Sequence, residues 1–216
     1  SIASEDLETL QKNLVLSHAC GVGDLLPDAV TRLLMVLKIA SLSKGASGVR
    51  RHTLETLIGM VNAGVLPLIP SKGSVGASGD LAPLSHLAIV LLGGGEAFFA
   101  GERLAGAEAL RRAGLAAVSL SYKEGLALNN GTAQMLAMGV LALHRLEQML
   151  DTADLAAAMT IDAFAGRLGA FAPEVHALRP HPGQVQVAAN LCTLLGVPSP
   201  HPTPEQTYMF ERPVTF

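Results

Sequence analysis

The stretch Gly73-Ser-Val-Gly-Ala-Ser-Gly-Asp-Leu-Ala-Pro-Leu84 joins a glycine-punctuated loop to an apolar segment. Glycine adopts positive φ at little cost, so its recurrence every third residue predicts a tight loop ending at Asp80. The apolar run that starts at Leu81 predicts a buried helix, with Asp80 near its N-cap. A helix buried on all sides needs other helices packed around it, which favours a helical bundle.

This loop fits neither of two familiar glycine-rich templates. No Gly-Lys-Ser/Thr follows the glycines, which excludes a P-loop, and Asp80 stands where a nucleophile elbow needs its second glycine. From spacing alone, a plain loop before a helix is the commonest interpretation. The alternative is chemical: the nitrogen of Gly79 attacks the carbonyl carbon of Ala77.

In this alternative each residue of the triplet Ala77-Ser78-Gly79 has a reason to be there. Gly79 has no side chain to block the attack, Ala77 keeps its own small, and Ser78 loses its hydroxyl to leave an exocyclic methylene. Closure with loss of two waters gives a methylidene-imidazolone, an electrophile that needs no external cofactor. A helix N-terminus directed at it would stabilise developing negative charge.

The composition supports a mainly α fold, a helical bundle with a Gly-rich catalytic loop and at most a short β-hairpin. Half of the 216 residues are apolar, Trp is absent and aromatic residues make up 4%. Residues 1–204 are expected to form a single lobe and 205–216 a tail, with prolines extending the chain beyond 198. The hairpin is expected within 96–106 and a turn over 125–131. Helices are predicted over 4–18, 28–42, 48–62, 107–113, 132–165 and 184–195.

Charge and cysteine usage exclude several partner classes. The net charge is −3 and Lys and Arg are scattered, so neither nucleic acid nor a membrane surface is an expected partner. No apolar run reaches the roughly 20 residues of a membrane span. Cys20 and Cys192 make no disulfide framework, which favours a reducing cytoplasm. The histidines fit no metal-ligand spacing, so no metal is predicted.

The stretch 73–84 resembles the signature of the aromatic amino-acid ammonia-lyases, which act on histidine, phenylalanine or tyrosine and include related aminomutases. The resemblance extends over 13–21, 125–132 and 178–184. It implies that Ala77, Ser78 and Gly79 form the methylidene-imidazolone and that Asp80 assists its formation. It also implies that Asn130 hydrogen-bonds near the ring, whereas the residues alone favour a plain turn there.

The pair Ser17-His18 resembles the substrate-selecting pair of the histidine-specific members. It implies elimination of ammonia from L-histidine to give trans-urocanate. A histidine at this place could equally cap the end of a helix, and phenylalanine or tyrosine remains an alternative substrate.

The resemblance places the catalytic base, a tyrosine, upstream of Ser1, so this chain is expected to be a fragment of a homotetrameric, cytoplasmic enzyme. Tyr122 and Tyr208 lie outside the matching motif. A catalytically silent helical assembly module that has kept the loop is the alternative function.

Overall fold

The structure is a computed structural model that describes residues 6–196. The chain divides into two compact units, unit 1 ending at Ala142 and unit 2 beginning at Leu143. The single lobe predicted over 1–204 stays a prediction. The helix start expected at Ser4 and the proline-rich tail lie outside the described residues.

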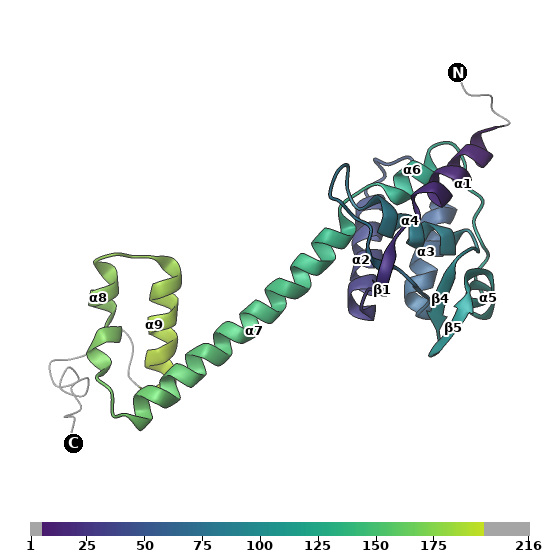
Figure 1. Ribbon diagram of the computed structural model, residues 1–216. Coiled ribbons are helices and arrows are strands. Elements are labelled where there is room, and N and C mark those ends of the chain that lie inside the picture. Colours follow the sequence, from purple (N-terminus) through teal and green to yellow (C-terminus); the bar gives the residue numbers. More distant parts are fainter. Residues whose placement is uncertain (1–5, 197–216) are drawn as a thin grey trace. The chain divides into compact units, whose positions relative to one another are not determined.

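Unit 1 is built mainly from helices, and the mainly α class is confirmed (Figure 1). Its helices are α1 (Leu7–His18), α2 (Asp28–Leu42), α3 (Arg51–Ala63), α4 (Leu81–Leu91), α5 (Gly106–Arg112), α6 (Glu124–Asn129) and α7 (Ala133–Ala163) as far as Ala142. Its strands are β1 (Val22–Leu25), β2 (Leu66–Pro67), β3 (Pro70–Lys72), β4 (Glu96–Phe99) and β5 (Glu102–Ala105).

The β structure exceeds the single hairpin expected from the sequence. β4 and β5 form that hairpin, and β2 adds to β4 to give a sheet of order β2-β4-β5. A second, antiparallel sheet pairs β1 with β3 and places Val22 opposite Lys72. All four residues of β1 are exposed, so the strand has none of the apolar alternation by which strands are predicted.

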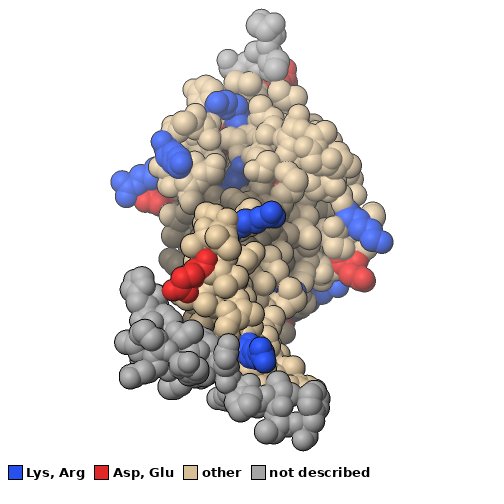
Figure 2. Space-filling model, turned by 90° about the vertical axis from the view of Figure 1, so that its left-hand side faces the viewer, with Lys and Arg blue, Asp and Glu red and all other residues tan. Residues whose placement is uncertain are grey.

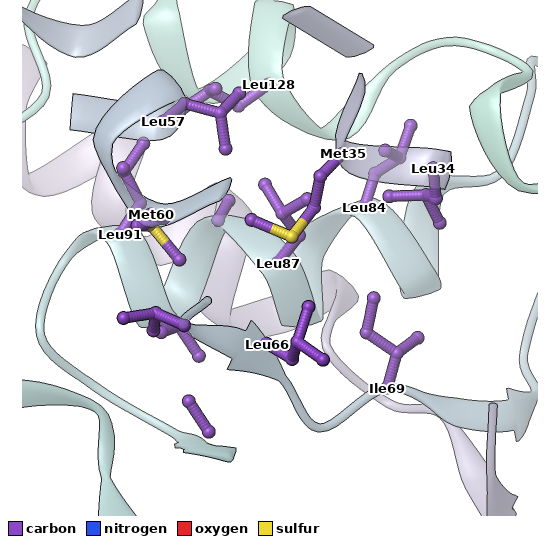
Figure 3. Packing of buried hydrophobic residues seen from close by; sticks show 14 of the residues in the cluster. Leu34, Met35, Leu57, Met60, Leu66, Ile69, Leu84, Leu87, Leu91 and Leu128 are labelled. Carbon is purple, nitrogen blue, oxygen red and sulfur yellow. The ribbon is translucent and has the colours of Figure 1, made fainter. Parts of the chain in front are cut away.

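The core of unit 1 surrounds α4, as Figure 3 shows. Most residues of α4 are buried, which confirms the buried helix predicted from Leu81. Pro83 lies in its first turn, where a missing N–H costs no intrahelical hydrogen bond. Fully buried side chains of this core come from α2, α3 and α6, among them Leu34, Met35, Leu57, Met60 and Leu128, and further ones come from α1 and α5.

The turn predicted over 125–131 is wrong, because residues 124–129 form α6. This short helix is held from outside: Gly125 N donates to Gln11 Oε1 of α1 at 2.8 Å. The buried carboxylate of Glu124 accepts hydrogen bonds from Arg50, the residue before α3, and from Thr53 in the first turn of α3. Burial raises the pKa of Glu124, but these hydrogen bonds outweigh it and hold the pKa below its usual value.

Unit 2 contains the rest of α7, the 3₁₀ helix η2 (Leu168–Phe171), α8 (Pro173–Ala177) and α9 (Pro182–Leu194). Asn190 Nδ2 of α9 donates to Asp154 Oδ2 of α7 at 2.7 Å. Many large apolar side chains in this unit are exposed, among them Met149, Met159 and Leu178. Within 6–196 no helix is long and apolar enough to cross a membrane.

Charged side chains form no single patch on the face that Figure 2 shows. Lys and Arg are spread over this face, some of them beside Asp or Glu, and most of it is uncharged. Over the described residues, no group of three His, Cys, Asp or Glu side chains could hold a metal ion.

Candidate active site

The candidate site is centred on the loop that runs from β3 to α4, residues 73–80. The loop leaves the β1–β3 sheet after Lys72 and enters α4 at Leu81. Both ends are therefore fixed by regular structure, and the triplet Ala77-Ser78-Gly79 lies directly before the first turn of α4.

The backbone of the triplet is in a conformation that few side chains tolerate. Ser78 has a φ of 59°, one of four non-glycine residues with positive φ in the described part of the chain. Such residues cost of order 1 kcal/mol or more and persist only where the surroundings enforce them. Gly79 has a φ of 104°.

Gly79 is pressed against Gly131, with which it forms an isolated parallel bridge. A Cβ atom at position 79 would lie 2.3 Å from Gly131 O. Only glycine fits this contact. The structure thus gives Gly79 a packing reason in addition to the chemical one, at the residue whose nitrogen would attack Ala77.

Asp80 is fully buried and joins the loop to two helices. It occupies the N-cap position of α4, as predicted, but its side chain does not cap that helix. Its Oδ2 instead accepts the N–H groups of Gln134 and Met135, at 2.8 and 3.0 Å, at the start of α7. Ser74 Oγ donates to Oδ1 at 2.7 Å, and Asp80 N donates to Gly131 O at 2.7 Å.

A carboxylate is well placed at this point, because the first N–H groups of a helix lack intrahelical partners and carry partial positive charge. Asp80 therefore fixes the end of the triplet against the N-terminus of α7.

Asn130 follows the last residue of α6 and precedes Gly131. Its backbone is extended, and its N–H donates to Leu126 O at 3.1 Å. Its exposed side-chain amide makes no hydrogen bond to any described residue, so both its donor and its acceptor are available to a ligand. The Gly79–Gly131 bridge places this residue directly beside the triplet.

Ser17 and His18 form the last turn of α1. His18 Nδ1 lies 2.9 Å from Leu14 O and 2.9 Å from Ser17 Oγ, so it donates to the carbonyl in one tautomer and accepts from the hydroxyl in the other. Ser17 Oγ donates to the same carbonyl at 2.9 Å. The contact between Nδ1 and Leu14 O agrees with the interpretation of His18 as a residue that caps the end of α1. Its Nε2 makes no hydrogen bond to a described residue and is left for a ligand.

The end of α1 and the 73–80 loop share a pocket of about 210 Å³. Its lining includes His18 from α1, Ala77 and Gly79 from the loop, and Leu81 and Ala82 from α4. Ser17, Ser78, Asp80 and Asn130 do not line it. Asp80 is the buried residue that follows Gly79, and its N–H donates to Gly131 O. Asn130 precedes Gly131, which pairs with the pocket residue Gly79.

The residues fit a ring formed from the chain itself. Ser78 is held in the left-handed region, Gly79 lies against the backbone of Gly131 with no room for a side chain, and the segment is anchored on both sides. This arrangement brings two peptide groups of the triplet into a tight turn with a hydroxyl side chain between them, which is what cyclisation followed by dehydration requires.

Sequence reasoning missed Lys38, whose ammonium donates to Ala127 O and Asn130 O at 2.6 Å each. A signal for it was present. Leu34, Lys38 and Leu42 follow one another at intervals of four residues in α2, so Lys38 lies on the apolar stripe of that helix.

Comparisons with known proteins agree on one family. The sequence model described as aromatic amino acid lyase matches residues 1–207. The histidine ammonia-lyase of Caldanaerobacter subterraneus subsp. tengcongensis is 53% identical over 190 residues, which cover 88% of this chain and 37% of that protein. The chain thus spans less than half the length of this curated relative.

Solved structures show the same fold. The phenylalanine aminomutase of Pantoea agglomerans superposes with a TM-score of 0.87 at 37% identity, over 91% of this chain and 38% of that one. The histidine ammonia-lyase of Trypanosoma cruzi superposes with a TM-score of 0.85 at 39% identity, over 88% and 38% respectively.

Proposed function

The chain belongs to the aromatic amino acid lyase family, and from this premise we propose that its full-length enzyme eliminates ammonia from L-histidine to give trans-urocanate. The observation that carries the proposal is the shared pocket, which is lined by His18 and by Ala77 and Gly79 on either side of Ser78. The similarity to two histidine ammonia-lyases supports the choice of substrate.

The electrophile arises from the triplet without an external cofactor. The nitrogen of Gly79 bonds to the carbonyl carbon of Ala77, and one water leaves as the ring closes. A second water leaves when the hydroxyl of Ser78 departs with its α-proton, giving the exocyclic methylene. The ring supplies an electrophilic carbon for the substrate. The close packing of Gly131 against Gly79 and the left-handed backbone of Ser78 favour closure, because they already restrict the backbone of the triplet to a strained turn.

His18 selects the substrate through its free ring nitrogen. In the tautomer whose Nδ1 donates to Leu14 O, Nε2 accepts a hydrogen bond from the N–H of a substrate imidazole; in the other tautomer, Nε2 donates to the unprotonated imidazole nitrogen. A pocket that carries such a polar partner rejects a ring without its complement, because the partner would be buried unpaired. This property favours histidine over phenylalanine.

Asn130 orients the reacting centre with its unpaired amide, and a tyrosine from another part of the full-length enzyme takes the β-proton before ammonia leaves. We place the enzyme in the cytoplasm as a homotetramer with a small amino-acid substrate.

The test is product release by the purified full-length enzyme from L-histidine, L-tyrosine and L-phenylalanine, measured as ammonia and as the conjugated acid, together with intact mass. We expect turnover of histidine above the other two and a mass deficit of two waters in the peptide 77–79. Preference for phenylalanine or tyrosine would overturn the substrate. An unmodified mass without turnover would overturn the lyase proposal and support the silent assembly module.

A further inference from the structure

Lys38 is a buried amine in the middle of α2, where it is 3% exposed. Lysine is among the residues least often buried, and it is usually paired when it is. Within 6–196, no carboxylate lies within salt-bridge distance of this ammonium. The mechanism proposed above does not use it, so its place in the core needs another reason.

The partners of Lys38 are both backbone carbonyls at the end of α6. Its Nζ donates to Ala127 O and to Asn130 O, at 2.6 Å each. The last carbonyls of a helix have no intrahelical partner and carry partial negative charge, so a cation is favourable there. One side chain of α2 thus closes the end of α6, from a position 92 residues earlier in the chain than Asn130.

The same contacts fix the peptide groups on either side of Asn130. Its N–H donates to Leu126 O, and its carbonyl accepts from Lys38. The next carbonyl, that of Gly131, accepts from Asp80 N of the ring-forming loop. The segment 130–131 is therefore held by α2 through one carbonyl and by the loop through the next. The side chain of Asn130 is left free between these two attachments.

Burying the ammonium is costly, and burial lowers the pKa of Lys38 to about 8. An apolar residue on this stripe would fill the space without that cost. Because the surrounding positions of the stripe are Leu34 and Leu42, packing alone gives no reason for a lysine here. The two carbonyl contacts are what an apolar residue would lose.

We propose that Lys38 is a positioning residue for the reaction: its ammonium fixes residues 127–131 and so holds the Asn130 side chain and the Gly131 carbonyl at the ring-forming loop. The proposal rests on the proposed function for the role of Asn130. Lys38 itself touches neither the pocket nor the reacting atoms.

The experiment compares variants of the full-length enzyme. Lys38→Met keeps the length of the stem and removes the donors, Lys38→Arg keeps a cation with several donors, and Asn130→Ala shows what loss of that side chain costs. Thr53→Val is the matched control, because Thr53 is equally buried and donates to Glu124 at the opposite end of α6. The readouts are kcat and KM for histidine, intact mass, thermal midpoint and amide exchange of peptides covering 125–135.

In Lys38→Met we expect kcat to fall roughly tenfold or more, approaching the loss in Asn130→Ala, because small displacements of an orienting group cost up to about a hundredfold. KM should change less than kcat, exchange at 127–131 should accelerate, and Lys38→Arg should recover most of the lost kcat. Thr53→Val should lower the thermal midpoint while its kcat stays within about twofold of wild type.

The proposal is overturned if Lys38→Met and Thr53→Val have equal kcat, or if exchange at 127–131 is unchanged in Lys38→Met. If Lys38→Met does not fold, Lys38→Gln takes its place, and wild-type kcat and exchange in that variant overturn the proposal. A wild-type enzyme without turnover would refute the proposed function instead. Amide exchange would still decide whether Lys38 fixes the segment.

Discussion

Gly79 is the residue at which packing and chemistry make the same demand. A Cβ there would lie 2.3 Å from Gly131 O, whereas at Gly76, in the same loop and also with positive φ, the nearest atom would be 3.8 Å away. We expect Gly79→Ala to prevent ring formation in the full-length enzyme, with no deficit of two waters in its intact mass and no turnover. Gly76→Ala should keep the deficit and lose about 1 kcal/mol of stability. An intact ring in Gly79→Ala would contradict the role given to the close contact between residues 79 and 131.

The pair Ser17 and His18 allows a test of substrate choice. Of the two, only His18 lines the pocket, so we propose its ring as the group that selects the substrate. We expect the double change Ser17→Phe with His18→Leu to lower kcat/KM for histidine by roughly a hundredfold or more and to raise it for phenylalanine. Ser17→Phe alone, with His18 kept, should still prefer histidine. Unchanged preference in the double variant would refute the assignment.

His86 gives unit 1 a pH-sensitive contact. Its Nε2 accepts the N–H of Gly21 at 3.1 Å, and burial lowers the pKa of His86 below 6.5. The native state thus favours neutral His86, so below 6.5 the unfolded chain binds the proton first and the free energy of unfolding falls. We expect the thermal midpoint of wild type to drop more between about pH 7.5 and pH 5.5 than that of His86→Gln, which keeps an acceptor and does not titrate. Parallel curves would contradict this.

At the scale of elements, Asp80 acts between helices and not within one. It begins α4 by position and caps α7 by hydrogen bonding, and it has no exposed surface. We expect Asp80→Asn to lower stability by about 1–3 kcal/mol, because the charge at the α7 N-terminus and the acceptor for Ser74 are both lost.

The control is Asp28→Asn, which removes an exposed acidic residue from the first turn of α2 and should cost about 0.5 kcal/mol. Equal thermal midpoints for the two variants would show that the buried contacts of Asp80 contribute nothing beyond an ordinary helix end.

The elements that sequence reasoning predicted well are those whose signal is local. α2 begins at Asp28 and ends at Leu42 as expected, because its apolar residues recur at helical spacing without a break. α6 was missed because two glycines and two asparagines between 125 and 131 favour a turn. The helix depends on hydrogen bonds with Gln11 and Thr53, which are distant in the sequence. The β1–β3 pair depends likewise on a partner outside its own segment.

The same division holds for the site. Ala77, Ser78 and Gly79 are adjacent in the chain, so a motif identifies them. The position of Lys38 on the apolar stripe of α2 marks it as unusual, but its role depends on carbonyl partners 89 and 92 residues away, and the capping of α7 by Asp80 spans 54 residues. Their roles follow from packing, which one sequence does not display.

At the scale of the whole molecule, the described helices leave much apolar surface uncovered. Large apolar side chains are exposed along α7, including Met149 at 60% and Met159 at 65%. Soluble monomers rarely leave large contiguous apolar patches open. The rest of the full-length chain or a neighbouring subunit would cover this surface. For the homotetramer proposed above, we expect four times the mass of the full-length chain by light scattering at all concentrations that support activity. An active monomer would contradict this expectation.

Asp80 and Gln134 are 54 positions apart in the chain, and this separation sets the order in which the site is synthesised and assembled. At a synthesis rate of about 5–20 residues per second, the loop 73–80 is synthesised several seconds before the segment around Gly131 that packs against it. A nascent or truncated chain would therefore carry three ordinary amino acids and no reactive group. If ring closure needs the Gly131 contact, the electrophile forms only after the chain has folded. A misfolded copy then carries no electrophile that could react with other molecules in the cell.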